Sequence, residues 1–351
     1  MTGTAERRGL PSSRRVASRS GIRRRLSALA EGPEIRVATE LRTVSAWVGV
    51  AALILAVAPT VAGARATRSP GPHSAGCGSA VTAGTTDEAI TSGGAARRYR
   101  LAVPADSGQR ALPLILNFQG FSSDAGQQAI YSQLEAKGPP RGYAVATPQG
   151  TGTPAFWNIL PKLPAPDDVA FTNALIDHLE QTRCIDPTRV YSTGISNGAG
   201  MSALLGCRIP NRLAAIAPVA GVNLVAGCQK GAPMSVLAFH GSADPVVAYR
   251  GARSSFAQIP VVAVPKSVAT WAKRAGCGST PTIRKVTPHV QRTSYPGCTA
   301  GTNVELYTII GGGHTWPGSI DLAYLGATTH EINATDLILA FFAHHTRPGA
   351  K

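Results

Sequence analysis

The stretch RVYSTGISNGAGMSALLGCR, residues 189–208, decides the fold of this chain. Its first seven residues are rich in apolar and β-branched side chains and predict a buried strand, and residues 197–208 predict a helix despite their glycines. Ser196 stands at the junction, in a G-x-S-x-G pattern that occurs once in the chain. A serine on a sharp turn between a strand and a helix is the arrangement of a nucleophile elbow. The alternative is a solvated serine in a glycine-rich loop, since the chain has 38 glycines.

Strands and helices are predicted to alternate on both sides of this stretch. Apolar runs predict further strands at 95–103, 112–118, 143–148, 213–221, 234–241 and 304–310. Apolar residues at helical spacing predict helices at 167–183, where Asp167 or Asp168 can cap the first turn, and at 334–345. Such alternation predicts an α/β fold, with a mostly parallel sheet flanked by helices.

The first 64 residues are predicted to be a targeting segment. An arginine-rich run at 7–26 precedes an apolar stretch at 44–66, and Ala62-Gly63-Ala64 fits a small-residue cleavage site. Residues 1–64 therefore predict a signal peptide with a long basic leader, or an uncleaved signal anchor as the alternative. Residues 65–94 would be an exported N-terminal segment, and residues 95–351 a single catalytic domain.

Composition argues for a globular protein without a nucleic-acid partner. Charged residues make up 15% of the chain and hydrophobic residues 44%. The formal net charge is +15, but ten arginines and four glutamates lie in the first 64 residues, and the remaining charge is scattered. No basic stripe interleaved with aromatic residues follows residue 65, so nucleic acid is not an expected partner.

All six cysteines follow the predicted leader. An even number of cysteines in an exported chain indicates up to three disulfides, with buried free thiols as the alternative. No C-x-x-C pair occurs, so no metal site is expected. Six cysteines allow 15 connectivities. Loops between nearest neighbours favour Cys277–Cys298 and Cys207–Cys228, which leaves Cys77–Cys184, and the connectivity beyond Cys277–Cys298 stays open.

A nucleophilic serine needs a base and an orienting carboxylate, and after a nucleophile elbow the chain order is serine, acid, histidine. Only two acids lie between Ser196 and His314. Glu305 falls within a predicted strand, whereas Asp244 follows the strand MSVLAFHG, in a loop of the kind that forms sites in parallel sheets. Asp244 is therefore the predicted acid; its alternative role is to cap a turn before Pro245.

Five histidines follow Asp244, and His314 is the predicted base. It lies in GGGHTWPG directly after a predicted strand, and the three glycines permit a loop that approaches its neighbours closely. His289 precedes an apparent strand, and three histidines near the closing helix are expected to face solvent: His330, His344 and His345. His240 precedes Asp244, so the chain order excludes it as the base, and a structural hydrogen bond is expected for it.

Five blocks of the sequence together resemble one known family. They are LPLILNFQGFSSDAGQQ, PQGTGTPAFWN, DDVAFTNALIDHLEQTRCIDPTRVYSTGISNGAGMSALLGC, FHGSADPVVAYRG and GGGHTWPG. In this order they resemble the secreted poly(3-hydroxybutyrate) depolymerase and feruloyl esterase family, related to carbohydrate esterase family 1, from about residue 95 to the C-terminus. The resemblance implies an α/β-hydrolase fold and the same triad. One departure is Gln119-Gly120, where the family usually has His-Gly.

These observations predict a secreted serine carboxylesterase that forms an acyl-enzyme and needs no cofactor. The oxyanion would be held by the backbone N–H groups of Phe121 and Asn197. The loops predicted to lie near Ser196 hold three aromatic residues that are candidate substrate-pocket walls: Phe121, Trp157 and Trp316. A core role is the alternative for Trp157. The expected partner is a small ester or oligoester, with membrane contact only through an uncleaved anchor. The alternative function is an exported non-catalytic binding or cell-wall interaction protein on the same fold.

Overall fold

The computed structural model describes residues 73–79, 81–105, 107–108, 110–160, 166–225, 228, 231–253, 260–299 and 301–347. The predicted leader, residues 1–64, and the first part of the predicted segment 65–94 lie outside these ranges. Within them, no helix combines the length and the apolar character needed to cross a membrane.

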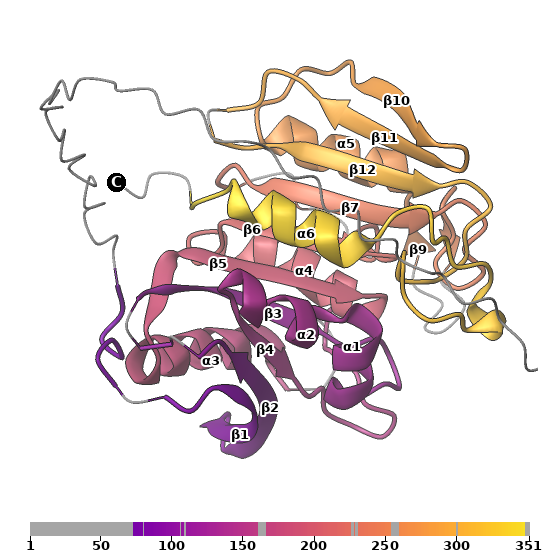
Figure 1. Cartoon of the computed structure of the whole chain (residues 1–351). Helices are drawn as coiled ribbons and strands as arrows, with labels where there is room; N and C mark the ends of the chain where they lie inside the picture. The colour runs from indigo at the N-terminus through magenta and orange to yellow at the C-terminus, as the bar shows by residue number, and fades with distance from the viewer. Residues whose placement is uncertain are drawn as a thin grey trace, which may run out of the picture. The chain divides into compact units, whose positions relative to one another are not determined.

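A ten-stranded sheet forms the centre of the fold (Figure 1). Its strands are β1 (Gly84–Ser92), β2 (Ala95–Val103), β3 (Leu112–Phe118), β4 (Ala144–Pro148), β5 (Ile185–Ile195), β6 (Ala215–Val219), β7 (Ser235–Gly241), β10 (Thr282–Thr287), β11 (Val290–Tyr295) and β12 (Val304–Ile309). Their spatial order is β1-β2-β4-β3-β5-β6-β7-β12-β11-β10. The six strands from β4 to β12 in that order run parallel, and two antiparallel strands extend each edge. Two short strands, β8 (Ala252–Arg253) and β9 (Pro260–Val261), pair separately.

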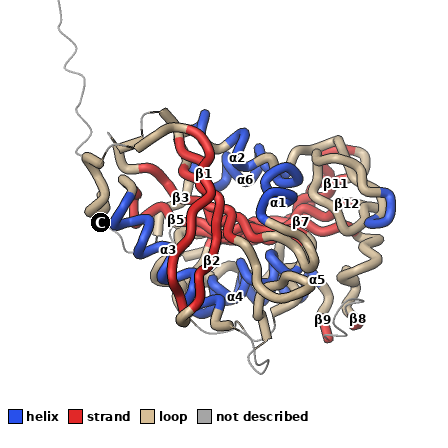
Figure 2. Tube along the Cα trace, turned by 90° about the horizontal axis from the view of Figure 1, so that it is seen from below, coloured by secondary structure: helices blue, strands red, loops and turns tan. Residues whose placement is uncertain are grey.

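Helices cover both faces of the sheet (Figure 2). They are α1 (Ala125–Ser132), α2 (Leu134–Lys137), α3 (Asp168–Thr182), α4 (Asn197–Arg208), α5 (Val264–Arg274) and α6 (Ala334–Ala343), with 3₁₀ turns at Pro139–Arg141 and Ala323–Leu325. Side chains of α3, α4 and α5 join one apolar cluster, and those of α1, α2 and α6 join the other. The central strands are therefore buried on both sides, which explains their continuous apolar runs.

The predicted α/β fold is confirmed, and its elements lie close to the predicted ranges. The helix predicted at 167–183 begins after Asp167, whose side chain accepts a hydrogen bond from the backbone N–H of Ala170. β1 was not predicted, because this edge strand is mostly exposed and carries no apolar alternation. It pairs with β2 along its whole length, so this part of the predicted segment 65–94 belongs to the sheet.

The three predicted disulfides are present: Cys77–Cys184, Cys207–Cys228 and Cys277–Cys298. The first ties the segment before β1 to the residue before β5. The second links the end of α4 to the loop that precedes β7. The third closes the excursion that contains β10 and β11, directly before β12.

A buried ion pair joins β2 to α3. Arg97 Nη2 lies 2.6 Å from Asp168 Oδ1, and both side chains are at most 3% exposed. The backbone N–H of Asn158 donates to the other carboxylate oxygen at 2.7 Å, and the guanidinium lies 3.9 Å from the centre of the Phe171 ring. The pair therefore fastens the loop before α3 to the sheet.

Replacing Asp168 with alanine should lower the free energy of unfolding by about 3–5 kcal/mol, because the charge of Arg97 would be left buried without its partner. The matched control is Asp177→Ala, which removes an ion pair with Arg212 from a side chain that is 53% exposed and should cost at most about 1 kcal/mol. Urea unfolding of both variants with the disulfides intact measures the difference. Equal losses would contradict the importance given to the buried pair.

Candidate active site

Ser196 alone separates β5 from α4. Its backbone has φ 57° and ψ −122°, a region that side-chain-bearing residues adopt at a cost of about 1–3 kcal/mol. Its N–H donates to Val219 O at 2.9 Å, and its carbonyl accepts from Gly200 N at 3.0 Å. At Gly198 an added Cβ would lie 2.2 Å from Phe118 O, so only glycine permits the helix to start this close to the sheet. The turn is the predicted strand–serine–helix arrangement.

The loops that follow β7 and β12 are joined to each other. The two strands are parallel neighbours, and Ser242 N donates to Ile309 O at 2.8 Å. Ala243 N donates to Gly312 O at 3.0 Å, and a Cβ on Gly241 would lie 2.2 Å from that same oxygen. This close approach brings Asp244, three residues after β7, beside His314, five residues after β12.

His314 Nδ1 lies 2.8 Å from Asp244 Oδ2, and both residues are buried. The other carboxylate oxygen accepts from the backbone N–H groups of Val246 and Val247, each at 2.8 Å. Burial alone would raise the pKa of Asp244, but hydrogen bonds from His240 and His314 outweigh it and hold that pKa well below its ordinary value. An ionised carboxylate only accepts, so Nδ1 of His314 carries a proton, and in the neutral ring Nε2 is free to accept one.

His240 supplies a second imidazole contact to the same carboxylate. Its Nε2 lies 2.8 Å from Val247 O and 3.3 Å from Asp244 Oδ2. The side chains of His240 and Asp244 are both fully buried. Because both partners are acceptors, Nε2 carries the proton. The structural hydrogen bond expected for His240 is therefore present, and it reaches the predicted acid as well.

A cavity of about 650 Å³ opens beside Ser196 and His314. Among the fifteen described residues that line it there is no aspartate, glutamate, lysine or arginine. Its wall contains Gly120, Phe121, Ser122 and Ser123 from the loop after β3, side chains of α1, and four residues of the chain that follows His314. This volume falls in the range of about 300–1,000 Å³ that is usual for small-molecule sites.

Gln119 holds the loop that contains Phe121. Its Nε2 donates to Ser123 O, and its Oε1 accepts from Gly150 N at 3.2 Å. A neutral amide thus bonds two loops at once at the position where the resembled family usually has histidine. Asn197, the first residue of α4, has a backbone N–H that cannot find an acceptor within its own helix.

Comparisons with known proteins show the family to which the chain belongs. The family model described as esterase PHB depolymerase matches residues 97–275, which is more than half of the chain. The chain belongs to this family. The enzyme class predicted from the sequence, a carboxylic ester hydrolase, agrees with that membership.

Relatives of this esterase-family chain carry names of ester hydrolases. Feruloyl esterase B of Piromyces equi is 34% identical over 218 residues, which are 59% of this chain and 40% of that protein. Feruloyl esterase D of Neurospora crassa is 30% identical over 207 residues, 56% of this chain and 67% of that protein. Acetyl xylan esterase from Aspergillus awamori superposes with a TM-score of 0.50 at 15% identity, over 74% of this chain and 99% of that one, which shows the shared fold. The chain thus spans less than half of the first relative's length.

The two tryptophans predicted to line the pocket lie in the core. Trp157 and Trp316 are each 1% exposed, and neither is among the residues that line the cavity. Trp157 packs edge-on against Phe118 at 5.0 Å and donates from Nε1 to Gln119 O, while Trp316 Nε1 donates to Thr335 Oγ1 at 2.9 Å. Their positions do not support the predicted pocket role. Both rings are buried in the core, and the N–H group of each indole is hydrogen-bonded there.

Three of the four exposed apolar residues that line the cavity were not foreseen. Phe121, predicted both as an oxyanion donor and as a pocket wall, does line it, whereas Ile130, Ile320 and Tyr324 were not singled out. These three belong to α1 and to the irregular segment after Trp316, neither of which shows a sequence motif. Exposure of large apolar side chains, which only the structure reveals, is the signal that finds them.

The acid and the histidines that were not chosen for the triad do not line the cavity. Glu305 is bound by both Nε and Nη2 of Arg292, at 2.8 and 2.6 Å, and stays within its strand. His330 and His344 are exposed as expected. The same expectation for His345 is wrong, because its ring packs against Phe341 at the end of α6, where it is 4% exposed and its Nδ1 bonds Phe341 O.

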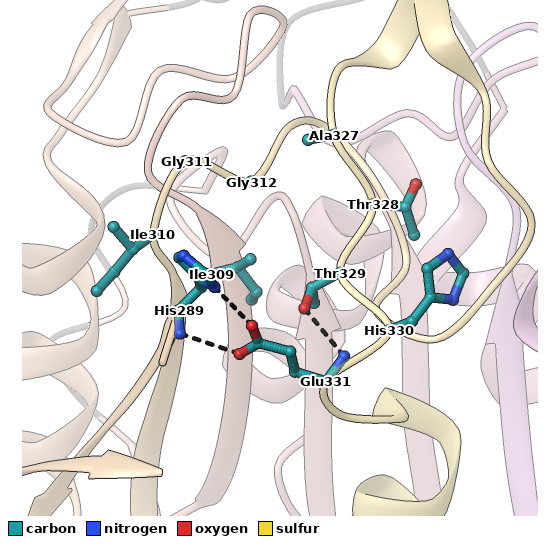
Figure 3. A pocket seen from close by; sticks show the side chains of 10 residues that line it. All are labelled: His289, Ile309, Ile310, Gly311, Gly312, Ala327, Thr328, Thr329, His330 and Glu331. Atoms are coloured by element: carbon teal, nitrogen blue, oxygen red, sulfur yellow. Dashed lines mark hydrogen bonds and ion pairs between the residues drawn. The ribbon is translucent and has the colours of Figure 1, made fainter. Parts of the chain in front are cut away.

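A second cavity, of about 250 Å³, is lined by His289 and by the segments 309–312 and 327–331 (Figure 3). Glu331 spans it, accepting from the N–H of His289 at 3.0 Å and from its Nδ1 at 2.6 Å. Hydrogen bonds from Thr287 and His289 lower the pKa of Glu331 to about 2. Among the described residues, no group of three or more histidine, cysteine, aspartate or glutamate side chains is arranged to hold a metal ion.

Replacing His240 with phenylalanine should lower the free energy of unfolding by about 1–3 kcal/mol, because Val247 O would lose its buried donor while the ring volume is kept. The control His330→Phe alters an exposed ring paired with exposed Asp321 and should stay within about 0.5 kcal/mol. Urea unfolding at pH 7 measures both changes.

The pH dependence of that difference tests the bond to Asp244. Donors that lower the pKa of a carboxylate confer stability that is present above its ordinary pKa of about 4 and is lost as the pH falls toward the lowered value. The gap between wild type and H240F should therefore narrow below about pH 4. An unchanged gap between pH 7 and pH 3 would contradict the role of His240 as a donor to Asp244.

Proposed function

We propose that this protein is an exported serine carboxylesterase in which Ser196 is the nucleophile, His314 the general base and Asp244 the orienting acid. Two observations together carry the proposal. Ser196 and His314 line one cavity that contains no aspartate, glutamate, lysine or arginine, and Asp244 is bonded to Nδ1 of His314, which leaves Nε2 to act as the base. The strained backbone of Ser196 adds support, because strain of this kind collects at functional turns.

In this mechanism His314 Nε2 takes the proton of Ser196 as its Oγ attacks the ester carbonyl carbon. Asp244 keeps the imidazole in the tautomer that accepts this proton and stabilises the imidazolium that forms. The backbone N–H groups of Asn197 and Phe121 bind the tetrahedral oxyanion, each worth about 3–4 kcal/mol of transition-state stabilisation. His314 then protonates the leaving alcohol, an acyl-enzyme remains, and water activated by the same histidine releases the acid. No metal or organic cofactor takes part.

Export and substrate type are part of the same proposal. Three disulfides are typical of proteins from oxidising compartments, and residues 1–64 have the composition of a targeting segment. The names of the relatives, feruloyl esterase and acetyl xylan esterase, support small esters of aromatic or short acids as substrates. A cavity lined by no aspartate, glutamate, lysine or arginine favours uncharged esters.

Replacing Ser196 with alanine should reduce kcat/KM for nitrophenyl acetate by about 10⁴-fold or more, because the reaction loses its nucleophile. Asp244→Asn should reduce it by about 10⁴-fold, since the amide favours the wrong imidazole tautomer. Ser202→Ala is the matched control: this serine is fully buried in α4, its hydroxyl has no partner among the described residues, and activity should be retained.

A fluorophosphonate probe separates this function from the alternative of a non-catalytic binding protein. Wild type and Ser202→Ala should be labelled covalently at one serine, and Ser196→Ala should not. A folded wild-type protein that neither reacts with the probe nor hydrolyses a panel of nitrophenyl acetate, methyl ferulate, acetylated xylan and hydroxybutyrate oligomers would refute the esterase proposal.

A further inference from the structure

Large exposed apolar side chains gather at the mouth of the Ser196 cavity. Eight such side chains are exposed in the described part of the chain, and four of them line this one cavity. Their exposed fractions are 39% for Phe121, 69% for Ile130, 52% for Ile320 and 78% for Tyr324. A cluster of this kind is costly to leave in water and marks a surface that binds something apolar.

Two of the four belong to a segment that we name the wall loop, residues 318–333, between Pro317 and α6. Its ends are held together, because Gly318 N donates to Thr329 O at 2.8 Å and Asn333 Nδ2 donates to Gly318 O at 3.3 Å. Ser319 Oγ donates to Tyr131 O at 2.7 Å, which fastens the loop to α1, another element of the cavity wall. The wall loop is therefore held in one position by hydrogen bonds within itself and to α1.

The far end of the wall loop is anchored to another part of the sheet. Glu331 accepts hydrogen bonds from His289, in the turn between β10 and β11 (Figure 3). It also accepts one from Thr287, the last residue of β10. This anchor lies in the second cavity, away from Ser196, so it holds the loop without occupying the site.

The wall loop also bonds to the backbone that carries the proposed base. Leu325 O accepts from His314 N at 2.7 Å, and Ala327 O accepts from Gly313 N at 2.9 Å. A group bound against Ile320 and Tyr324 is thus held by the same loop that positions His314. Fixing a remote part of the substrate in this way orients the reacting bond.

We propose that Ile130, Ile320 and Tyr324 form a subsite that binds an uncharged apolar chain of the ester, beyond the atoms that react. The inference rests on the proposed esterase function and extends it to residues that no sequence motif marks. No lysine or arginine lines the cavity, so a chain that ends in a carboxylate would lose water without gaining a cationic partner from either residue type.

The test compares esters that differ only in chain length. One series varies the acyl chain, with nitrophenyl acetate, butyrate and octanoate; the other varies the alcohol, with ethyl and octyl acetate. Tyr324→Ala and Ile320→Ala should each lower kcat/KM for the long member by about 10-fold, mainly through KM, and change the short member by less than about 2-fold. The matched control is Ile283→Ala, an apolar residue on β10 that is 62% exposed and does not line the cavity; it should change neither.

The outcomes distinguish the acyl chain of the ester from its alcohol chain, and the subsite proposal from the esterase proposal. A selective loss in the acyl series assigns the subsite to the acid, and a selective loss in the alcohol series assigns it to the alcohol. Wild-type ratios of long to short ester in both Tyr324→Ala and Ile320→Ala would overturn the subsite while leaving the esterase function intact. Mono-nitrophenyl suberate should react at least about 10-fold more slowly than the octanoate, and equal rates would overturn the preference for an uncharged chain.

A binding measurement decides the subsite independently of turnover. N-octylacetamide and N-ethyloctanamide are uncharged, resist hydrolysis and place the long chain on the alcohol side and on the acyl side, so their calorimetric Kd values on the full chain report binding even if no ester is hydrolysed. Tyr324→Ala should weaken the binding of at least one of the two amides by about 10-fold, and Ile283→Ala should leave both unchanged. Equal Kd values in wild type and Tyr324→Ala for both amides would contradict the subsite.

Discussion

The hydrogen bond from His314 to Asp244 depends on one constraint, the parallel pairing of β7 with β12. The two strands end at the same edge, so their loops leave the sheet side by side. Gly241 and Gly312 approach too closely to admit a side chain between them, which fixes the distance from each loop to its neighbour. Because the two loops are joined by backbone hydrogen bonds, the backbone alone places the Asp244 carboxylate within hydrogen-bond reach of the His314 imidazole.

Behind the serine, a second set of contacts makes the turn rigid. Asn197 bonds both backbone groups of Trp157, at 2.7 and 3.1 Å, and the indole N–H of Trp157 bonds Gln119 O. Gln119 in turn bonds the loops on either side of it. The loop proposed to donate to the oxyanion is therefore held by the core. The Trp157 ring packs against Phe118 of β3, and its only donor, the indole N–H, is bonded to Gln119 O. The buried ring thereby stabilises both the Gln119 loop and the turn at Ser196.

Much of the fold and three of the candidate site residues could be predicted from the sequence, because they rest on local patterns. Continuous apolar runs predict strands buried on both faces, and G-x-S-x-G between a strand and a helix predicts the turn at Ser196. Chain order then leaves Asp244 and His314 as the acid and the base. Nearest-neighbour spacing favours two of the disulfides that the structure contains, and the third pair follows by remainder. Each of these inferences needs only neighbours along the chain or the direction of parallel strands.

Only the tertiary structure decided which side chains face the cavity. Trp157 and Trp316 lie near Ser196 in the chain's loops, yet their rings turn into the core, and Ile320 and Tyr324 take the exposed positions. The contact of His240 with Asp244 and the anchoring of the wall loop by Glu331 likewise join residues whose pairing follows no motif. Sequence patterns report periodicity along one element, whereas the direction of a loop side chain depends on packing against segments that are distant in the chain.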